Sequence, residues 1–458
     1  MEVTDKLLSI YNTRYRGVFY SLYPLWPNEN RDAGNIRELT HFQTVLAGPK
    51  ASDENAHIYI HIPFCDSFCS FCAIPKRIAK PDLVDDFLDA LKQEISMYSD
   101  KPYVQSCKFR SLYLGGGTPS VLTLEQLSWL LDYCFDHLPI EKDAEITVEG
   151  STHNFSEEKL EIVLEKGANR VSFGIQSFND PVRQILDLQD DAQAAIFALK
   201  SARKAGFDTI DIDLMYSLPG QTLADVEEDF HIAADLGLEN ISFYPLHVGK
   251  GTRLYNRIQA GAIPLGSLKL EVRMYLKAVE TAKAAGYEQQ SILSKWILPD
   301  KLCLAEKHRM GPYDCLALGP SGNGNLGDYV YRNVSSLQDY LALIKEGGYP
   351  MGCGQKILAE ENIRRYMCRA FSFLKMDKIE FEQRFSMSPE QAFPEEISFL
   401  QRQGFIAIDN KEIRLTPVGE IWGQNVCVEF CSKPWKERLL PEETNQKAQP
   451  QHSCKAQR

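Results

Sequence analysis

The chain has 458 residues, 44% of them hydrophobic, and its 62 acidic residues outnumber its 50 basic residues, which gives a formal net charge of −12. This length suffices for a large core and more than one domain, and the negative charge argues against a protein that sheathes nucleic acid. The sequence holds no apolar run long enough for a membrane helix, and residues 1–17 lack the basic-then-apolar order of a secretory signal. We therefore expect a cytoplasmic protein that binds neither nucleic acid nor a membrane.

Short apolar runs that are typical of strands alternate with longer amphipathic stretches. The expected strands are 58–62, 111–115, 145–149, 170–175, 209–215 and 241–246. The expected helices between them are 82–98, 123–137, 156–166, 190–205 and 222–237. This alternation predicts an α/β fold with βαβ units and a mainly parallel sheet. Six such units favour an open, partial (β/α)6 barrel, in which the chemistry sits at the carboxyl ends of the strands.

The chain divides into four expected regions. Residues 1–55 form an N-terminal arm, and residues 56–345 form the barrel with an extension that borders the substrate. Residues 346–440 form a smaller, mostly helical domain, in which "FLQRQGFIAIDNKEIRLTPVGEIWGQ" predicts a winged-helix-like order of helix, two strands and helix. Residues 441–458 are polar and are expected to form a disordered tail.

Cys65, Cys69 and Cys72 follow the first expected strand with the spacing C-x3-C-x2-C. Thiolates are suited to zinc, copper(I) or iron–sulfur clusters. A zinc site would need a fourth ligand, and here only His57 or His61 is near in sequence. In a four-iron cluster, three cysteines leave one iron open to chelate a small molecule. The spacing favours this cluster, with zinc and chance spacing as the alternatives.

The cysteine segment "YIHIPFCDSFCSFC" resembles the signature of the radical S-adenosylmethionine (SAM) superfamily. The resemblance implies a [4Fe-4S] cluster held by Cys65, Cys69 and Cys72, with the methionine end of SAM on the open iron. In this superfamily an electron from the cluster breaks a carbon–sulfur bond of SAM, and the resulting 5′-deoxyadenosyl radical abstracts hydrogen. The resemblance also implies a dry pocket and a reducing electron donor of the flavodoxin or ferredoxin type.

Nearly the whole chain is similar to oxygen-independent coproporphyrinogen III oxidases and their relatives. The similar segments include "LYLGGGTPSVL", "EITVEGS", "VSFGIQSFN", "IDIDLMYSLPGQT" and "LGPSGNGNLGDYVYRN". By this resemblance the SAM-binding residues are Tyr59, Gly115, Gly116, Gly117, Thr118, Glu149, Gln176, Asp213 and Met215. The glycines would let the backbone approach the methionine moiety, and Met215 would line the adenine pocket. The plainer alternatives are a tight turn for the glycines, a solvated acid for Glu149, and cap or turn roles for Gln176 and Asp213.

Some positions depart from the oxidases. Ile74 stands where they carry a fourth cysteine, and Leu188 stands where they carry an arginine that contacts SAM, while Arg183 is displaced by more than a helical turn. An arginine suits a carboxylate in a way that leucine cannot replace. His247 stands where their loop after the sixth strand has alanine. These departures favour their relatives, the class C radical SAM methyltransferases and cyclopropanases, which use two SAM molecules.

The sequence therefore predicts a radical SAM enzyme that uses two SAM molecules to methylate or cyclopropanate an sp2 carbon of an unsaturated or heteroaromatic small molecule. His247 would be the proton-transfer residue, although a histidine in a loop is more often only structural, and Tyr59 would act beside the cluster. The alternatives are a coproporphyrinogen oxidative decarboxylase, a haem-binding chaperone of the same family, and a barrel stapled by zinc. A monomer is expected.

Overall fold

The computed structural model describes residues 3, 5–8, 23–25, 38–292 and 295–439. Most of the expected N-terminal arm and the whole of the expected tail at 441–458 lie outside these described residues. The described part of the arm includes α1 (Asp5–Leu8) and α2 (Leu39–Ala47).

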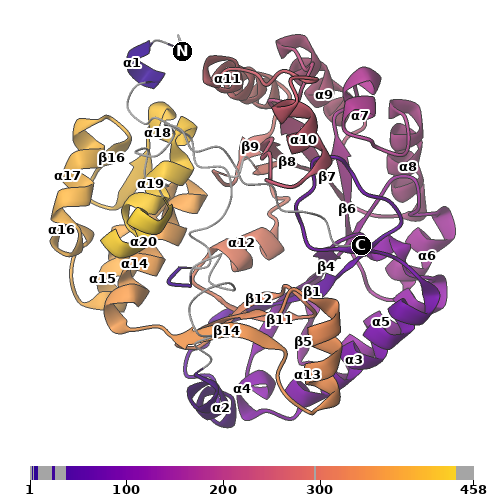
Figure 1. Cartoon of the computed structure of the whole chain (residues 1–458). Coiled ribbons are helices and arrows are strands. Elements are labelled where there is room, and N and C mark those ends of the chain that lie inside the picture. The colour runs from indigo at the N-terminus through magenta and orange to yellow at the C-terminus, as the bar shows by residue number, and fades with distance from the viewer. Residues whose placement is uncertain (1–2, 4, 9–22, 26–37, 293–294, 440–458) are drawn as a thin grey trace, which may run out of the picture.

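Six parallel strands form the barrel wall, and each pairs with the next along the chain. They are β1 (Asn55–Ile62), β4 (Lys108–Gly116), β5 (Ile140–Gly150), β6 (Arg170–Gln176), β7 (Thr209–Tyr216) and β8 (Asn240–Pro245). The helices outside this wall include α3 (Pro81–Ser99), α5 (Leu124–His137), α6 (Glu157–Glu165), α8 (Ala192–Ala205) and α9 (Leu223–Asp235). Strands and helices coincide with those expected from the sequence, so the partial barrel is confirmed (Figure 1).

The sheet is longer than the six-stranded barrel, because strands are added at both of its edges. Next to β1 lie β11 (Asp314–Leu318), which is parallel to it, and the antiparallel strands β12 (Asn323–Leu326), β13 (Tyr329–Asn333) and β14 (Met351–Lys356). Next to β8 lie β10 (Lys295–Ile297) and β9 (Glu288–Gln289). β14 belongs to this sheet, although it lies beyond residue 345, where the sequence analysis begins the C-terminal domain.

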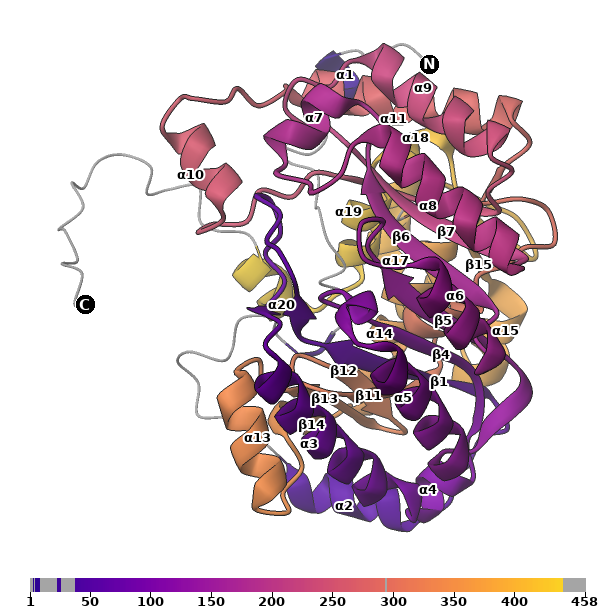
Figure 2. The same cartoon turned by 90° about the vertical axis from the view of Figure 1, so that its right-hand side faces the viewer.

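The remaining helices border this sheet. They are α4 (Pro102–Gln105), α7 (Asp180–Ile185), α10 (Arg253–Gln259), α11 (Leu268–Ala284), α12 (Leu304–Met310) and α13 (Leu337–Lys345). Figures 1 and 2 both show α13 lying beside α3, where the two helices are in contact.

The barrel wall separates two kinds of side chain, because successive strand residues point to opposite faces. The outward residues are apolar and fully buried beneath the helices, as for Ile58, Ile60, Leu112, Leu114, Val148 and Phe243. The inward residues are polar or aromatic and stay partly accessible, as for Tyr59, Tyr113, Glu149, Asp213 and Tyr244. The inside of the barrel is therefore a polar lumen and not a packed core.

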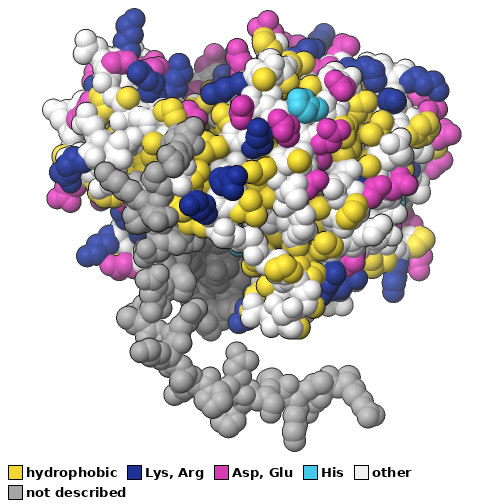
Figure 3. All heavy atoms as spheres, turned by 90° about the horizontal axis from the view of Figure 1, so that it is seen from above, with side chains coloured by type: hydrophobic (Ala, Val, Ile, Leu, Met, Phe, Trp, Pro, Cys, Tyr) yellow, Lys and Arg dark blue, Asp and Glu magenta, His cyan; other side chains and the backbone are white. Residues whose placement is uncertain are grey.

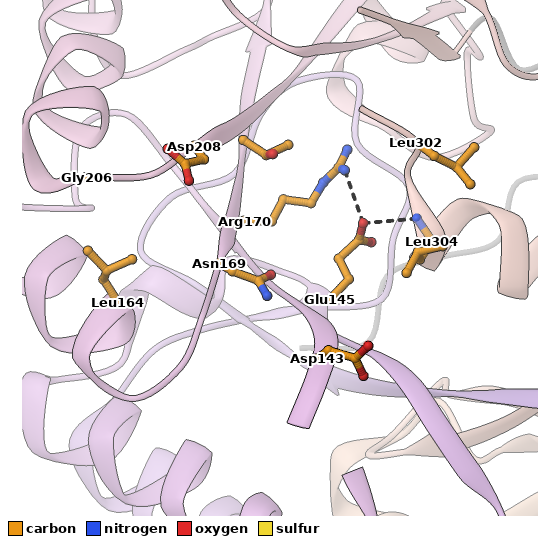
Figure 4. Close-up of a pocket in the computed structure, with 10 residues that line it drawn as sticks. Asp143, Glu145, Leu164, Asn169, Arg170, Gly206, Asp208, Leu302 and Leu304 are labelled. Carbon is orange, nitrogen blue, oxygen red and sulfur yellow. Dashed lines mark hydrogen bonds and ion pairs between the residues drawn. The ribbon is translucent and has the colours of Figure 1, made fainter. Parts of the chain in front are cut away.

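The helix α12 lies at the floor of this lumen, where the strands begin. The backbone N–H groups of Leu304 and Ala305 donate to the Glu145 carboxylate at 3.0 and 2.8 Å. Figure 4 shows Glu145 between Leu304 and Arg170, beside a pocket that opens at this end of the barrel. A carboxylate at the start of a helix satisfies N–H groups that have no partner within the helix, and here it fixes α12 to β5.

The C-terminal domain is mostly helical, as expected from the sequence. Its helices are α14 (Ala359–Ala370), α15 (Lys378–Phe385), α16 (Pro389–Ala392), α17 (Pro394–Arg402), α18 (Pro417–Ile421), α19 (Gly423–Glu429) and α20 (Lys433–Leu439). A small antiparallel sheet has the order β15 (Lys375–Asp377), β17 (Glu412–Leu415), β16 (Ile406–Ile408). The winged order of helix, two strands and helix is present from α17 to α18.

Among the described helices, none combines the length and the hydropathy that crossing a bilayer requires. On the face that Figure 3 shows, acidic and basic side chains are interspersed over the part of the surface that the structure describes.

A buried carboxylate connects the added strands to the barrel. Glu94, on α3, is fully buried and accepts hydrogen bonds from the Gly319 N–H at 2.7 Å, the Asn333 amide at 3.0 Å and the Tyr340 hydroxyl at 2.7 Å. These donors come from the ends of β11 and β13 and from α13. One side chain thus holds three segments of the extension against α3.

We expect Glu94→Ala to lower the free energy of unfolding by about 3 kcal/mol, because the substitution leaves three buried hydrogen-bond donors without an acceptor. Urea unfolding of the purified chain measures this loss. Asp86→Ala, at an exposed position of the same helix, is the matched control and should change the unfolding free energy by less than about 0.5 kcal/mol. Equal stability of the two variants would contradict the role assigned to Glu94.

Candidate active site

The three cysteines lie on the loop between β1 and α3. Two short parallel strands, β2 (Phe64–Cys65) and β3 (Arg77–Ile78), close the base of this loop. Cys65 is buried, and Cys69 and Cys72 are partly buried. Burial, with a smaller contribution from the charge of Cys72, raises the pKa of the Cys65 and Cys69 thiols to about 11. The three thiols are thus neighbours, and a bound metal would favour the thiolate form of Cys65 and Cys69.

Two other segments hold the cysteine loop in place. The Ser70 N–H donates to the Leu186 carbonyl at 2.9 Å, and the Ser70 carbonyl accepts from the Leu254 N–H at 2.8 Å. Figure 2 shows α10, which contains Leu254, beside the loop that leaves β1. Gly249 lies so near this loop that a Cβ atom there would come within 2.7 Å of the Ala73 Cβ. The loops after β6 and β8 therefore position the middle of the cysteine loop.

The glycine run at the end of β4 packs against the base of the same loop. The Gly117 N–H donates to the Ile62 carbonyl at 2.8 Å, and the Thr118 N–H donates to the Phe64 carbonyl at 2.7 Å. A Cβ atom at Gly117 would lie 2.4 Å from the Phe64 carbonyl oxygen. The Thr118 hydroxyl donates to the Cys65 sulfur at 3.4 Å. The approach of Gly117 to the Phe64 carbonyl requires glycine, because any side chain at this position would push the glycine run and the cysteine loop apart.

The first two glycines of the run also face crowded surroundings. Gly116 has φ +110°, and a Cβ atom there would come within 2.5 Å of the His61 ring. A Cβ atom at Gly115 would lie 2.7 Å from a carboxylate oxygen of Glu149. Because Gly115 has no side chain, the Tyr113 ring and the Glu149 carboxylate, both on the lumen side, approach its backbone closely.

Two lumen carboxyls have raised pKa values. Burial, followed by the negative charge of Asp213, raises the pKa of Glu149 to about 8, although the Gly116 N–H and the charge of Arg309 oppose this rise. Burial and the charge of Asp211 raise the pKa of Asp213 to about 6, although Tyr244 donates a hydrogen bond to it. Such a pair favours a cationic ligand, because a nearby positive charge restores both carboxylates to their ionised form.

Gln176 ends β6 in a strained conformation. Its φ is +67°, and Ser217 just after β7 has φ +62°, a region that residues other than glycine seldom adopt. The Gln176 side-chain oxygen is buried and has no hydrogen-bond partner. Met215, also buried, packs in an apolar cluster with Tyr244 and Phe71 of the cysteine loop. A polar acceptor without a partner beside an apolar wall is a suitable site for a nucleoside.

These features fit the two groups that the family resemblance implies. Cys65, Cys69 and Cys72 would hold three irons of a [4Fe-4S] cluster, and Gly115, Glu149, Gln176, Asp213 and Met215 would hold SAM. Within the described part of the chain, no three His, Cys, Asp or Glu side chains are arranged to hold a single metal ion. The Nδ1 atom of His57, one candidate fourth ligand for zinc, shares a hydrogen bond of 2.9 Å with Ser111. It is the family resemblance that implies the cluster, whose three thiolates would bind different irons.

The two catalytic candidates have different environments. Tyr59 faces the lumen, stacks with Tyr113 and shares a hydrogen bond of 3.1 Å with the Nδ1 atom of His61. His247 is exposed in the loop after β8, two residues before Gly249, which contacts the cysteine loop. Both positions border the proposed site, and the two catalytic roles stay predictions.

Arg183 is not free to replace the guanidinium that the oxidases carry. It is almost fully buried and donates to the carbonyls of Ile175 and Ser177 at 2.9 and 3.0 Å, and also to the Asp190 carboxylate. Leu188 packs against the apolar cluster that contains Met215. Beside it, Arg253 pairs with Asp187 at 3.4 Å, and Arg257 donates to the Ile185 carbonyl at 2.8 Å.

Sequence reasoning missed an ionic network lower in the lumen. Arg170 donates to Asp211 at 3.0 Å and to Glu145 at 3.4 Å, and Lys295 pairs with Asp211 and donates to Ser242 at 2.8 Å. Burial would raise the pKa of Asp211, but the charges of Lys295 and Arg170 outweigh burial and lower it. The only sequence signal was the pair of acids in "TIDIDLM", whose spacing of two places both on the inner face.

Comparisons with known proteins agree with this geometry. Residues 59–233 match the Radical SAM superfamily, and residues 373–421 match the HemN C-terminal domain. The chain is 31% identical to the heme chaperone HemW of Bacillus subtilis, over 80% of this chain and 97% of that protein. It is 27% identical to the oxygen-independent coproporphyrinogen III oxidase of Escherichia coli, over 93% of this chain and 94% of that protein. The solved structure of coproporphyrinogen III oxidase (HemN) from E. coli superposes with a TM-score of 0.78 at 25% identity, covering 92% of this chain and 99% of that one.

These relatives change one expectation from the sequence. They support a radical SAM enzyme with a cluster and SAM, but they give no support to methyl transfer or cyclopropanation, which the sequence analysis favoured. The alternatives, an oxidative decarboxylase or a haem chaperone, fit them better. The carbon-transfer expectation rested on Ile74, Leu188 and His247, and such local departures do not outweigh similarity over most of the chain.

We expect Gly117→Ala to displace the cysteine loop, because its Cβ atom would clash with the Phe64 carbonyl oxygen. After anaerobic reconstitution the variant should retain less than about a tenth of the iron and sulfide of the unaltered chain. Gly48→Ala is the control, since its Cβ atom would meet nothing within 4 Å. Full iron content in Gly117→Ala would show that this close approach is dispensable.

SAM affinity should depend on pH through Glu149. Its pKa of about 8 means that it is largely protonated below neutral pH, so binding of a cationic group must first remove the proton. The apparent dissociation constant should therefore rise as the pH falls from about 7.5 to about 6, by up to about tenfold per pH unit from this group. In Glu149→Gln the slope of log Kd against pH should be smaller by about one, as measured by anaerobic titration. Identical slopes would rule out Glu149 as the titrating group.

Proposed function

Because the chain belongs to the oxygen-independent coproporphyrinogen III oxidase-like family of the radical SAM superfamily, we propose that it abstracts a hydrogen atom from a tetrapyrrole that carries carboxylate side chains. The observation that carries the proposal is the packing of the three-cysteine loop against the glycine run, which brings the thiols beside the lumen acids. The curated relatives described above act on or bind haem or coproporphyrinogen according to their names, and this supports the substrate class.

When bound, the cluster supplies one electron that splits SAM into methionine and a radical that abstracts hydrogen. The residues of the chain provide the surroundings for this step. The glycine run and Glu149 would orient the methionine end, and Gln176 and Asp213 would fix the nucleoside. The floor helix α12 and its bonds to Glu145 close the lower end of the lumen, which restricts water around the reacting groups.

If the product carries a vinyl group, the chemistry is an oxidative decarboxylation. A propionate side chain then loses one hydrogen atom, carbon dioxide and one electron, and a one-electron acceptor must take that electron. Leu188 supplies no guanidinium, and the neighbouring Arg253 and Arg257 already contact Asp187 and the Ile185 carbonyl, so a substrate with several carboxylates needs further cations in the lumen.

A haem carrier is the second candidate. The chain covers 97% of the length of the B. subtilis heme chaperone, and a carrier would use the same lumen and C-terminal domain without consuming its ligand. A second SAM molecule, a flavodoxin- or ferredoxin-type donor and a monomeric state remain part of the proposal and rest on the sequence analysis alone.

The test is an anaerobic incubation of the reconstituted chain with dithionite, SAM and coproporphyrinogen III. We expect 5′-deoxyadenosine to form, to increase when the tetrapyrrole is added, and to be accompanied by carbon dioxide. Cys69→Ala should abolish its formation, because a cluster without its third thiolate cannot bind SAM productively. Cys134→Ala, which alters a buried cysteine on α5, is the control and should remain active.

Other outcomes of this experiment would support other functional hypotheses. Tight haem binding with no tetrapyrrole-dependent cleavage of SAM would select the carrier. Release of S-adenosylhomocysteine would favour the hypothesis of methylation or cyclopropanation. SAM cleavage that persists in Cys69→Ala would contradict the cluster assignment itself.

A further inference from the structure

One arginine in the C-terminal domain is buried with no matching anion among the described residues. Arg365, on α14, is 5% exposed, and its Nε and Nη2 atoms have no hydrogen-bond partner. Burial, followed by the charge of Arg369, disfavours its protonated form and lowers its pKa, and Asp314 opposes this only in part. Because a guanidinium stays protonated in proteins, the fold carries a cation that needs an anion.

Two further arginines, Arg369 and Arg332, lie near Arg365. Arg369 is one helical turn from Arg365 on α14 and donates to the Gly311 carbonyl at 2.7 Å. Arg332, on β13, donates through Nε to the Asn323 side chain at 2.9 Å. Both are less than 9% exposed, and both make further interactions. They add to the positive charge here but do not carry the argument.

Arg309 connects this place with the lumen. It sits near the end of α12, two residues before the glycine that Arg369 contacts, and its side chain is 50% exposed. It pairs with Glu306 at 3.0 Å, and its charge acts on Tyr59 and Glu149, both in the lumen. Figure 1 shows α12 between the barrel strands and the C-terminal domain that contains α14. Arg309 thus faces both the proposed SAM site and the region of Arg365.

The sheet register places these arginines near the lumen face of β11. Cys315 pairs with His57, and Ala317 pairs with Tyr59, so Cys315 shares the face of the sheet that bears Tyr59. The charges of Arg369, Arg309 and Arg365 all act on the Cys315 thiol. The nearby acids are Glu306, which Ser291 and Arg309 already contact, and Asp314, which accepts from Tyr103 at 2.7 Å.

We propose that Arg309 and Arg365, supported by Arg332 and Arg369, form a site for the carboxylate groups of the substrate, on the lumen side of β11–β13 and facing α14. This inference rests on the proposed function, which requires a ligand with several carboxylates and therefore several cations. Guanidinium groups bind carboxylates through paired hydrogen bonds, and several fixed cations match a ligand with several acids. The site therefore distinguishes a polyacid from its neutral ester.

The test is equilibrium binding of coproporphyrin III, which is already oxidised, and of its tetramethyl ester to the reconstituted full-length chain. We expect the unaltered chain to bind the free acid at least about tenfold more tightly than the ester. Arg309→Gln and Arg365→Met should each weaken binding of the acid by about tenfold or more, with little change for the ester. Thermal unfolding of Arg365→Met should be unchanged or shifted upward, because replacing an unpaired buried cation removes its desolvation cost.

Arg402→Met is the matched control, since Arg402 is an exposed arginine of the same domain that donates to the Ser398 hydroxyl at 3.1 Å. It should bind both ligands as the unaltered chain does. If Arg309→Gln and Arg365→Met retain acid binding, or if Arg365→Met mainly lowers the unfolding temperature, then Arg365 serves an internal contact and the inference fails while the proposed function stands. If the unaltered chain binds neither porphyrin, the proposed function and this site fall together.

Discussion

The site depends on one close approach between two backbones. The glycine run at the end of β4 lies directly against the base of the cysteine loop, and no Cβ atom fits between Gly117 and the Phe64 carbonyl oxygen. This contact fixes the distance from the thiols to the mouth of the lumen, and the Thr118 hydroxyl bond to Cys65 follows from it. Three thiols on a loop are mobile by default. Here the loops after β6 and β8 and the glycine run confine them from three directions.

The second constraint is electrostatic. It distinguishes the carboxyl groups near the floor of the lumen from those above them. Asp211 and Asp213 are two residues apart on the same face of β7, yet their pKa values shift in opposite directions. Asp211 lies among Arg170 and Lys295 and is held as a carboxylate, which makes the floor a closed ionic network. Asp213 and Glu149 lie above this network with less compensation. The charges at the floor of the barrel neutralise one another and have a structural role. The carboxyl groups of Asp213 and Glu149 above them are stabilised when a cation binds.

The sequence predicted the parts of the fold that have a strong local period. The barrel strands alternate apolar and polar residues, and the helices between them are amphipathic, so their positions could be read directly. The strands β11–β14 could not, because they have four to six residues each, two of them (β12 and β14) contain glycine, and β11 pairs with β1 across most of the barrel sequence. Cys65, Cys69 and Cys72 were found from spacing alone. Arg309 and Arg365 were not, because only the packing of α12 and α14 against the sheet brings them together, and neither residue belongs to a motif.

The departures from the oxidases acquire a physical meaning from this arrangement. Leu188 packs into an apolar cluster with Met215, and Arg183 is fully occupied by backbone carbonyls and Asp190. The side chain of Leu188 is thus committed to apolar contact, but a leucine there does not imply that carboxylates are absent from the ligand. Further cations lie at α12 and α14, where a buried guanidinium with no partner is tolerated only if an anion completes it. The same fold can change the residues that recognise carboxylates while the cysteine loop and the glycine run keep their positions, because the cysteine loop is held by backbone hydrogen bonds of Ser70 with Leu186 and Leu254, and the glycine run by backbone hydrogen bonds with Ile62 and Phe64.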